Sequence, residues 1–132
     1  EIENAIKETG VNGWVGCHLS HSYHSGASLY FTFGCLQRKG REIEQYLYVK
    51  KSAEDAFMKN GGTLSHHHAV GTEHLPWVEE DLSSTGLKAV KALKNGLDPN
   101  GIMNPGKIIP SENPLTDWGL SEEAINRIKS RS

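Results

Sequence analysis

Residues 28–35 read SLYFTFGC, and this stretch decides the fold class of the chain. Leu29, Phe31, Phe33 and Cys35 alternate with small or polar residues, and this period of two predicts a β-strand with one apolar face. Aromatic side chains suit a pleated, half-buried surface. We therefore expect the apolar face to pack against a core.

The preceding residues 14–21, WVGCHLSH, alternate in the same way and place Val15, Cys17 and Leu19 on one face. Only a short turn around Gly26 separates the two runs, and a short connection joins strands that run antiparallel. The sequence therefore predicts a β-hairpin.

On both sides of the hairpin the apolar residues recur with the period of an α-helix. Helices are expected over residues 1–10, 41–59, 82–96 and 121–130. Asp81 and Ser121 are expected to cap the last two helices. The apolar positions expected to line a helix face are Ile43, Tyr46, Leu47, Ala53, Ala56 and Phe57 in the second helix and Leu87, Val90, Leu93 and Leu97 in the third.

Two further segments complete the expected fold. Residues 63–67 are expected to add a third short strand, and residues 110–119, which contain Pro110 and Pro114, a surface loop. This order predicts an α+β fold, a small antiparallel sheet with helices packed on one face. The edges of so small a sheet are exposed unless other chain covers them, so a homo-oligomer is one expectation.

Composition excludes several classes of protein. The chain has 132 residues, the size of one domain, and a formal net charge of −2. Such a balance lacks the basic surface of nucleic-acid-binding proteins, and no apolar run approaches the roughly 20 residues that span a bilayer. Cys17 and Cys35 lie in apolar, strand-like runs, so we expect buried free thiols, as is typical of a reducing, cytoplasmic compartment.

The most distinctive feature is a run of three histidines, His66, His67 and His68, that follows Gly61 and Gly62. In a strand His66 and His68 share one face, so that two imidazoles reach one ligand. Three interpretations are open: a tag or solvated loop, a metal site of imidazole ligands, or a cluster that binds an anionic substrate and transfers protons. No spaced carboxylate or cysteine motif completes a coordination set, so no metal is predicted.

Two other segments carry polar groups. In residues 18–24, HLSHSYH, His18 and Ser20 share a strand face and Tyr23 follows at the strand end, where a phenol can act as a general acid or base. The alternative is an ordinary polar strand end. Residues 97–107, LDPNGIMNPGK, form two consecutive turns in which each residue also has a structural reason to be present.

Together these segments resemble a known family. GGTLSHHHAVG at residues 61–71, a helix, and DPNGIMNPGK at residues 98–107 are similar to the C-terminal part of FAD-linked oxidases of the vanillyl-alcohol oxidase type. The triple histidine after two glycines is more specific to the alkyldihydroxyacetonephosphate synthase branch. The resemblance covers roughly residues 14–109. It implies that residues 1–110 form the C-terminal part of a substrate cap domain, followed by a loop and short helix at 111–132.

The resemblance also implies an activity and roles for residues. It implies an ether-lipid type of alkyl transfer through a flavin adduct, with FAD bound mainly by an N-terminal domain outside these residues. Localisation is then expected to be cytoplasmic, or peroxisomal in a eukaryote. The implied roles are catalytic for Tyr23, His66, His67 and His68, substrate-binding for His18, His21 and His74, and cofactor-binding for Asn104.

Departures from the synthase pattern keep two alternatives open. Ala69 stands where the resemblance leads us to expect glycine, and residues 72–74, TEH, carry less positive charge than expected for a phosphate-bearing substrate. The first alternative is the cap of an FAD-dependent 2-hydroxy acid or alcohol dehydrogenase or oxidase. The second is a non-catalytic domain that pairs with a separate FAD subunit. The expected partners are a small-molecule or lipid-like substrate and an FAD-binding domain in cis or in trans, with the isolated chain inactive.

Overall fold

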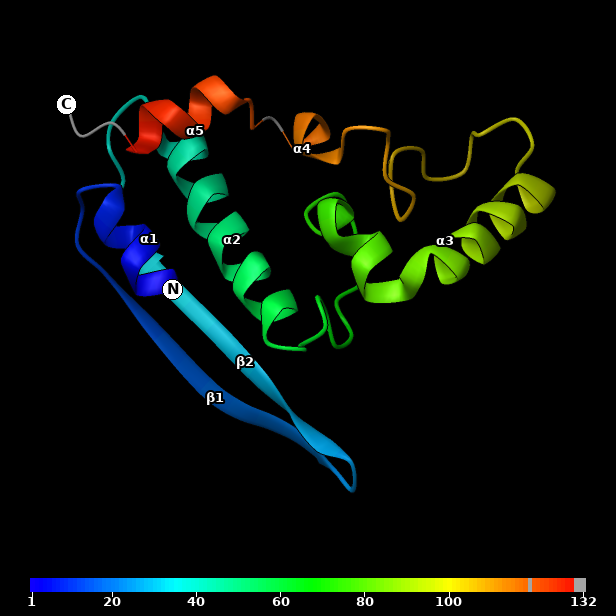
Figure 1. The fold of residues 1–132 in the computed structure, drawn as a ribbon, viewed down its shortest axis with the longest axis horizontal. Helices are drawn as coiled ribbons and strands as arrows, with labels where there is room; N and C mark the ends of the chain where they lie inside the picture. The colour runs from blue at the N-terminus through cyan, green and yellow to red at the C-terminus, as the bar shows by residue number, and fades with distance from the viewer. Residues whose placement is uncertain (119, 130–132) are drawn as a thin grey trace. The chain divides into compact units, whose positions relative to one another are not determined.

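A computed structural model describes residues 1–118 and 120–129, which divide into two compact units (Figure 1). The hairpin unit comprises Glu1–Ala56 together with the described residues from Glu122 onward, and the histidine unit comprises Phe57–Ser121. The two units contain two antiparallel strands and several helices, which confirms the α+β class.

The predicted hairpin is present in the hairpin unit. Strands β1 (Gly13–Tyr23) and β2 (Gly26–Cys35) pair antiparallel, from Gly13 opposite Cys35 at the base to Tyr23 opposite Gly26 at the turn. At about 3.3 Å per residue, the hairpin is roughly 35 Å long. In Figure 1 it extends beyond α1, which packs against β1 near the base.

The predicted third strand is wrong, because residues 63–67 are bends and irregular backbone and the described residues contain a sheet of two strands. The hydroxyl of Ser65 accepts the backbone N–H of His68, a donor that a strand would use in a ladder. Ala69 and Gly71 then take left-handed φ angles of 65° and 59°, which turn the chain. A histidine triplet has no apolar alternation to oppose this local structure.

Helices α1 (Ile2–Glu8) and α2 (Glu42–Lys59) build the core of the hairpin unit. Both match their predicted ranges to within two residues. Gly10 has a left-handed φ of 73°, which turns the chain away from the helical path after α1 ends. A Cβ atom at Gly13 would lie 2.7 Å from Cγ2 of Ile6, so the glycine lets α1 approach the base of the hairpin closely.

The buried face of α2 matches the prediction at Ala53 but differs from it elsewhere. Ile43 is 75% exposed and Tyr46 is exposed, whereas the buried positions are Gln45, Tyr48, Val49, Ala53 and Glu54. The amide of Gln45 explains this rotation: it donates to the carbonyl of Leu36 at 2.7 Å and to the Thr9 hydroxyl at 3.3 Å, and it accepts the N–H of Arg38 at 3.0 Å. Burial of an amide is favourable when its hydrogen bonds are made. The Gln45 amide therefore determines which face of α2 packs against the core.

The apolar face of the hairpin is half-buried near the base, at Val15, Phe33 and Cys35, but it is not covered toward the turn. The register places Cys17 opposite Phe31 and Leu19 opposite Leu29. All four are exposed, Leu19 by 64% and Leu29 by 58%. Cys17 is therefore not the buried thiol we expected, although both cysteines are free. Elsewhere in the hairpin unit, α5 (Glu122–Lys129) confirms the last predicted helix, whose expected end at Ser130 lies outside the described residues.

The histidine unit consists of η1 (Leu75–Trp77), α3 (Val78–Leu97) and α4 (Pro114–Asp117). The core contains Leu64, Leu75, Trp77, Val78, Leu87, Trp118 and Leu120. The rings of Trp77 and Trp118 meet edge to face, with centroids 5.5 Å apart and planes at 83°. This contact corrects the predicted surface loop at 110–119, which contains α4 and a buried tryptophan. Its described residues fold back onto η1 because Trp118 has a large apolar ring to bury.

Helix α3 starts earlier than predicted and is broken. It begins at Val78, so Asp81 lies inside the first turn and does not cap it. At Ser83 the backbone leaves the helix (φ 68°, ψ 161°), and the Ser83 hydroxyl accepts the N–H of Gly86 at 3.3 Å, which is how an N-cap starts a new helix. Of the four residues expected on the core face, Leu87 is buried and Leu97 is 73% exposed. In the part of the chain that the structure describes, no helix has the length and apolarity to span a membrane.

Candidate functional site

The turn end of the hairpin carries the first predicted cluster. The ladder pairs Ser20 with Ser28 and then Ser22 with Ala27, so His21 is an extra residue in β1, a β-bulge. Its φ of 43° is left-handed, and such bulges re-aim a side chain. Ser20 Oγ and His21 Nδ1 lie 2.6 Å apart and form a hydrogen bond. The serine thereby fixes the orientation of the exposed imidazole.

Tyr23 occupies the last position of β1 and is 54% exposed. His18, earlier on the same strand, lies across the ladder from Tyr30, with ring centroids 6.0 Å apart. The hairpin therefore presents a phenol and two imidazoles, those of His18 and His21, on an exposed surface. Their catalytic and substrate-binding roles stay predictions.

The histidine run lies in the histidine unit, between α2 and η1. His66 Nδ1 and His67 Nδ1 are 2.8 Å apart, so one ring donates a hydrogen bond and the other accepts it. The rings of His67 and His68 follow with centroids 4.4 Å apart, and all three side chains are exposed. The structure brings together the three predicted imidazoles. It does so through bends, not through the alternation of a strand.

The loop that carries the run is held at both ends. Before it, the Thr63 hydroxyl donates to Asp81 Oδ1 of α3 at 2.8 Å. After it, His74 Nδ1 donates to the carbonyl of Val70 at 3.0 Å. His74 is half-buried and has this structural role, while its predicted role in substrate binding stays a prediction. The run thus lies on an anchored backbone.

The third predicted segment is organised by Asp98, which sequence reasoning did not single out. Asp98 is 7% exposed, and its carboxylate accepts the backbone N–H groups of Ile102 and Met103, each at 3.0 Å. The ammonium of Lys94 bonds to the same carboxylate and to the Met103 carbonyl. The Lys94 hydrogen bond, together with the two N–H groups, holds the pKa of Asp98 below its ordinary value although burial opposes this. An aspartate at the start of a Pro-Asn-Gly turn was the signal for this role.

Asn104, the predicted cofactor contact, is an exposed turn residue with a left-handed φ of 47°. Its neighbours Ile102 and Met103 are 77% and 62% exposed. The turn therefore offers an apolar surface beside one amide. The cofactor contact stays a prediction.

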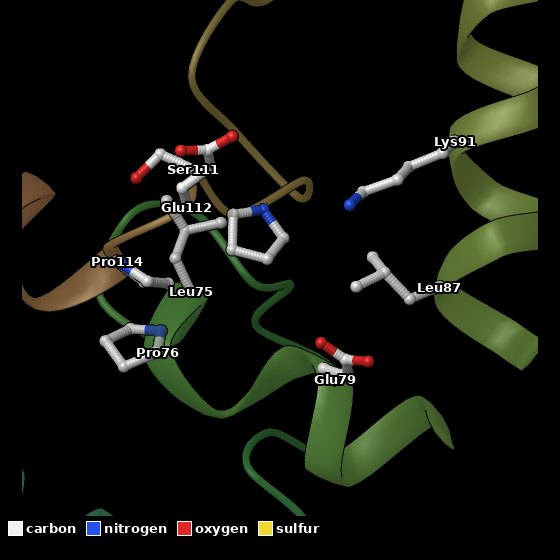
Figure 2. A pocket seen from close by; sticks show the side chains of 9 residues that line it. Leu75, Pro76, Glu79, Leu87, Lys91, Ser111, Glu112 and Pro114 are labelled. Carbon is white, nitrogen blue, oxygen red and sulfur yellow. The ribbon is translucent and has the colours of Figure 1, made fainter. Parts of the chain in front are cut away.

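The histidine unit also contains a cavity of about 410 Å³ that the sequence did not predict. Figure 2 shows Lys91 and Leu87 of α3 facing the residues of η1 and of the segment that precedes α4. Glu79 and Glu112 also line it, beside leucines and prolines. Its two carboxylates and one ammonium give a lining that does not favour a polyanion.

These groups allow a test of whether the chain can hold FAD by itself. A dinucleotide needs a cradle of backbone N–H groups or cations for its pyrophosphate. The cavity carries an excess of carboxylates, and the exposed imidazoles and phenol instead suit substrate contacts and proton transfer. The lining of this cavity therefore does not fit the pyrophosphate of FAD.

Comparisons with known proteins identify the family of the chain. A family model described as "FAD linked oxidases, C-terminal domain" matches residues 1–108. Alkyldihydroxyacetonephosphate synthase of Trypanosoma brucei brucei is 43% identical over 106 residues, and that of Dictyostelium discoideum is 40% identical over 106 residues. Each of these alignments covers 80% of this chain and 17% of the relative. A mitochondrial D-lactate dehydrogenase (cytochrome) of Arabidopsis thaliana is 47% identical over 49 residues, which is 37% of this chain and 9% of the relative.

The chain thus spans about 17% of the length of the synthases that it matches. The match covers the hairpin, the histidine run and the double turn. This chain belongs to the family of FAD-linked oxidase C-terminal domains.

Proposed function

We propose that the chain serves as part of a substrate cap in an FAD-dependent, ether-forming alkyl transfer of the alkyldihydroxyacetonephosphate synthase type. The observation that carries the proposal is the exposed cluster of His66, His67 and His68 on an anchored loop, in a chain 43% identical to a synthase. The flavin, when bound, supplies the electrophilic ring chemistry. The chain supplies proton transfer and substrate contacts.

The exposed groups suit these tasks. Imidazoles donate hydrogen bonds to phosphate oxygens and exchange protons near neutral pH. The phenol of Tyr23 at the hairpin end suits proton transfer to or from a reacting oxygen, a contribution of about 10²–10⁴-fold when well positioned. The Ser20 hydrogen bond orients the imidazole of His21 for a further substrate contact.

The FAD-binding domain acts in cis or in trans in this proposal. Its supporting observation is the apolar surface of the hairpin, where Leu19 is 64% exposed, Leu29 58% and Phe31 38%. Contiguous apolar surface of this kind marks an interaction site. In this proposal the FAD-binding domain is the partner that covers this surface.

A chimera tests the proposal. The matching 106 residues of the T. brucei synthase are replaced by their counterparts from this chain. The expected result is a flavoprotein that forms ether product from acyl-dihydroxyacetone phosphate and a fatty alcohol without net flavin reduction. Tyr23→Phe is expected to lower kcat by at least about 10²-fold, the lower range for acid–base catalysis, and Leu97→Ala, at an exposed position of α3, to leave it unchanged.

The second candidate is a dehydrogenase or oxidase of 2-hydroxy acids or alcohols. The 47% identity to a D-lactate dehydrogenase over 49 residues favours it. In that case the chimera bleaches its flavin when D-lactate is added in the absence of oxygen and forms no ether product. A chimera that retains FAD but neither forms ether product nor reduces its flavin with D-lactate supports the remaining alternative. In that alternative the chain is a non-catalytic domain that pairs with a separate FAD subunit.

A further inference from the structure

The geometry of the histidine run has a consequence that requires neither flavin nor substrate. His66 Nδ1 and His67 Nδ1 are 2.8 Å apart, with their rings nearly perpendicular at 87°. Two nitrogen ligands on one metal ion, with bonds of about 2.0–2.1 Å, are roughly 2.9–3.4 Å apart for bond angles between 90° and tetrahedral. A shift of a few tenths of an ångström, together with a rotation of the rings that points both Nδ1 lone pairs at the ion, therefore converts this pair into a chelating pair.

The chemistry of the pair selects the ion. In the hydrogen-bonded state one Nδ1 carries the proton and the other supplies a lone pair. Transfer of that proton to the Nε2 atom of the same ring frees both lone pairs without changing the charge of either imidazole. Imidazole ligands suit zinc, copper and nickel, whereas magnesium and calcium prefer oxygen.

The backbone around the pair is preorganised for binding. The Ser65 hydroxyl accepts the N–H of His68 at 3.2 Å, and the Thr63 hydroxyl bonds to Asp81 of α3 at 2.8 Å. Gly62 N–H donates to the carbonyl of Phe57 at 2.9 Å, which fixes the chain as it leaves α2. All three imidazoles are exposed, so an ion reaches them from solvent.

We propose that His66 and His67 chelate one divalent first-row transition-metal ion through their Nδ1 atoms, with the remaining coordination positions filled by water. His68 lies beside the pair, with its ring centroid 4.4 Å from that of His67, and is a contact of the site. The proposal gives the histidine run a ligand, a transition-metal ion, that the proposed alkyl transfer does not use.

The test is calorimetric titration of the purified chain with ZnCl₂ and, separately, NiCl₂. One ion per chain is expected. His66→Ala and His67→Ala are each expected to weaken binding by at least about tenfold, the lower bound for losing even an outer-shell partner. His24→Ala is the matched control, because His24 is an exposed histidine at the turn of the hairpin, outside the histidine run, and it is expected to bind zinc as the unmodified chain does.

A second measurement identifies the atoms. Long-range ¹H–¹⁵N correlation spectra are expected to show zinc-dependent shifts at Nδ1 of His66 and His67, which a fold-perturbing substitution does not mimic. Absence of binding at millimolar zinc, or binding that survives the double variant, overturns the proposal. Neither outcome bears on the alkyl transfer, which is tested by turnover of the chimera.

Discussion

At the residue scale, Ala69 is the clearest point of strain in the histidine loop. Its φ of 65° is left-handed, which costs an L-residue roughly 1–2 kcal/mol, whereas glycine adopts it freely. Replacement by glycine also loosens the unfolded chain, which offsets about 0.4–1 kcal/mol of this gain. Ala69→Gly is therefore expected to raise the free energy of unfolding by roughly 0.5–1 kcal/mol, measured by urea denaturation.

Gly71 supplies the matched control. Its φ is 59°, and an added Cβ meets no atom within 4 Å, so Gly71→Ala introduces backbone strain without a clash. The free energy of unfolding is expected to fall. A destabilising Ala69→Gly together with a neutral Gly71→Ala contradicts the left-handed geometry of this loop. The same φ explains why glycine suits position 69 in the pattern that the chain resembles.

At the element scale, Tyr48 links α2 to α1 through a hydrogen bond from its hydroxyl to the carboxylate of Glu8. Burial, supported by that carboxylate, raises the pKa of Tyr48 to about 12. Folding thus favours the protonated phenol, and its stabilising contribution is complete below the unfolded pKa near 10. That contribution is lost as the pH rises from about 10 through about 12.

Urea denaturation at several alkaline pH values tests this link. Tyr48→Phe is expected to remove part of the loss of stability between pH 10 and 12, and Glu8→Gln to reduce it, because the phenol keeps its burial but loses its charged neighbour. Identical alkaline slopes in the unmodified chain and in Tyr48→Phe would show that the phenol titrates as in the unfolded chain.

An aromatic contact of Trp118 with Trp77 helps to hold the segment from residue 110 to Trp118. Trp118 is 6% exposed and packs edge to face on Trp77. Trp118→Ala is expected to cost about 3–5 kcal/mol of folding free energy, as for other buried tryptophans. Leu97→Ala, at a site 73% exposed, is expected to cost about 0.5 kcal/mol or less. A thermal midpoint that is unchanged in Trp118→Ala contradicts the docking.

These elements also show what sequence could predict. The hairpin and α2 follow from clean periods of two and of about 3.6 residues, so both were found to within two residues. The burial of Ala53 in α2 was predicted, but that of Gln45 and Tyr48 was not, because it depends on hydrogen bonds of Gln45 to residues distant in the sequence. The shape of the histidine loop was missed because Ser65 and left-handed Ala69 determine it, and neither leaves an apolar pattern.

At the scale of the whole molecule, the uncovered hairpin face decides how the chain behaves alone. Leu19 and Leu29 form an exposed cross-strand pair, and Phe31 lies beside them on the same face. An isolated two-stranded hairpin is marginal in water, and apolar sheet surface associates with similar surface. Without the FAD-binding domain that we propose as its partner, the chain is therefore expected to self-associate.

Sedimentation velocity over a range of concentrations tests this expectation. The pair Leu19→Glu and Leu29→Glu places two like charges opposite each other on the exposed face, which is expected to shift the chain toward monomer. Leu97→Glu, an equally polar change at an exposed leucine of α3, is expected to leave the association unchanged. A monomer at all concentrations means that this face does not bind a second copy. If the hairpin pair also lowers FAD retention in the chimera, the face that self-associates in the isolated chain is the one that the FAD-binding domain covers.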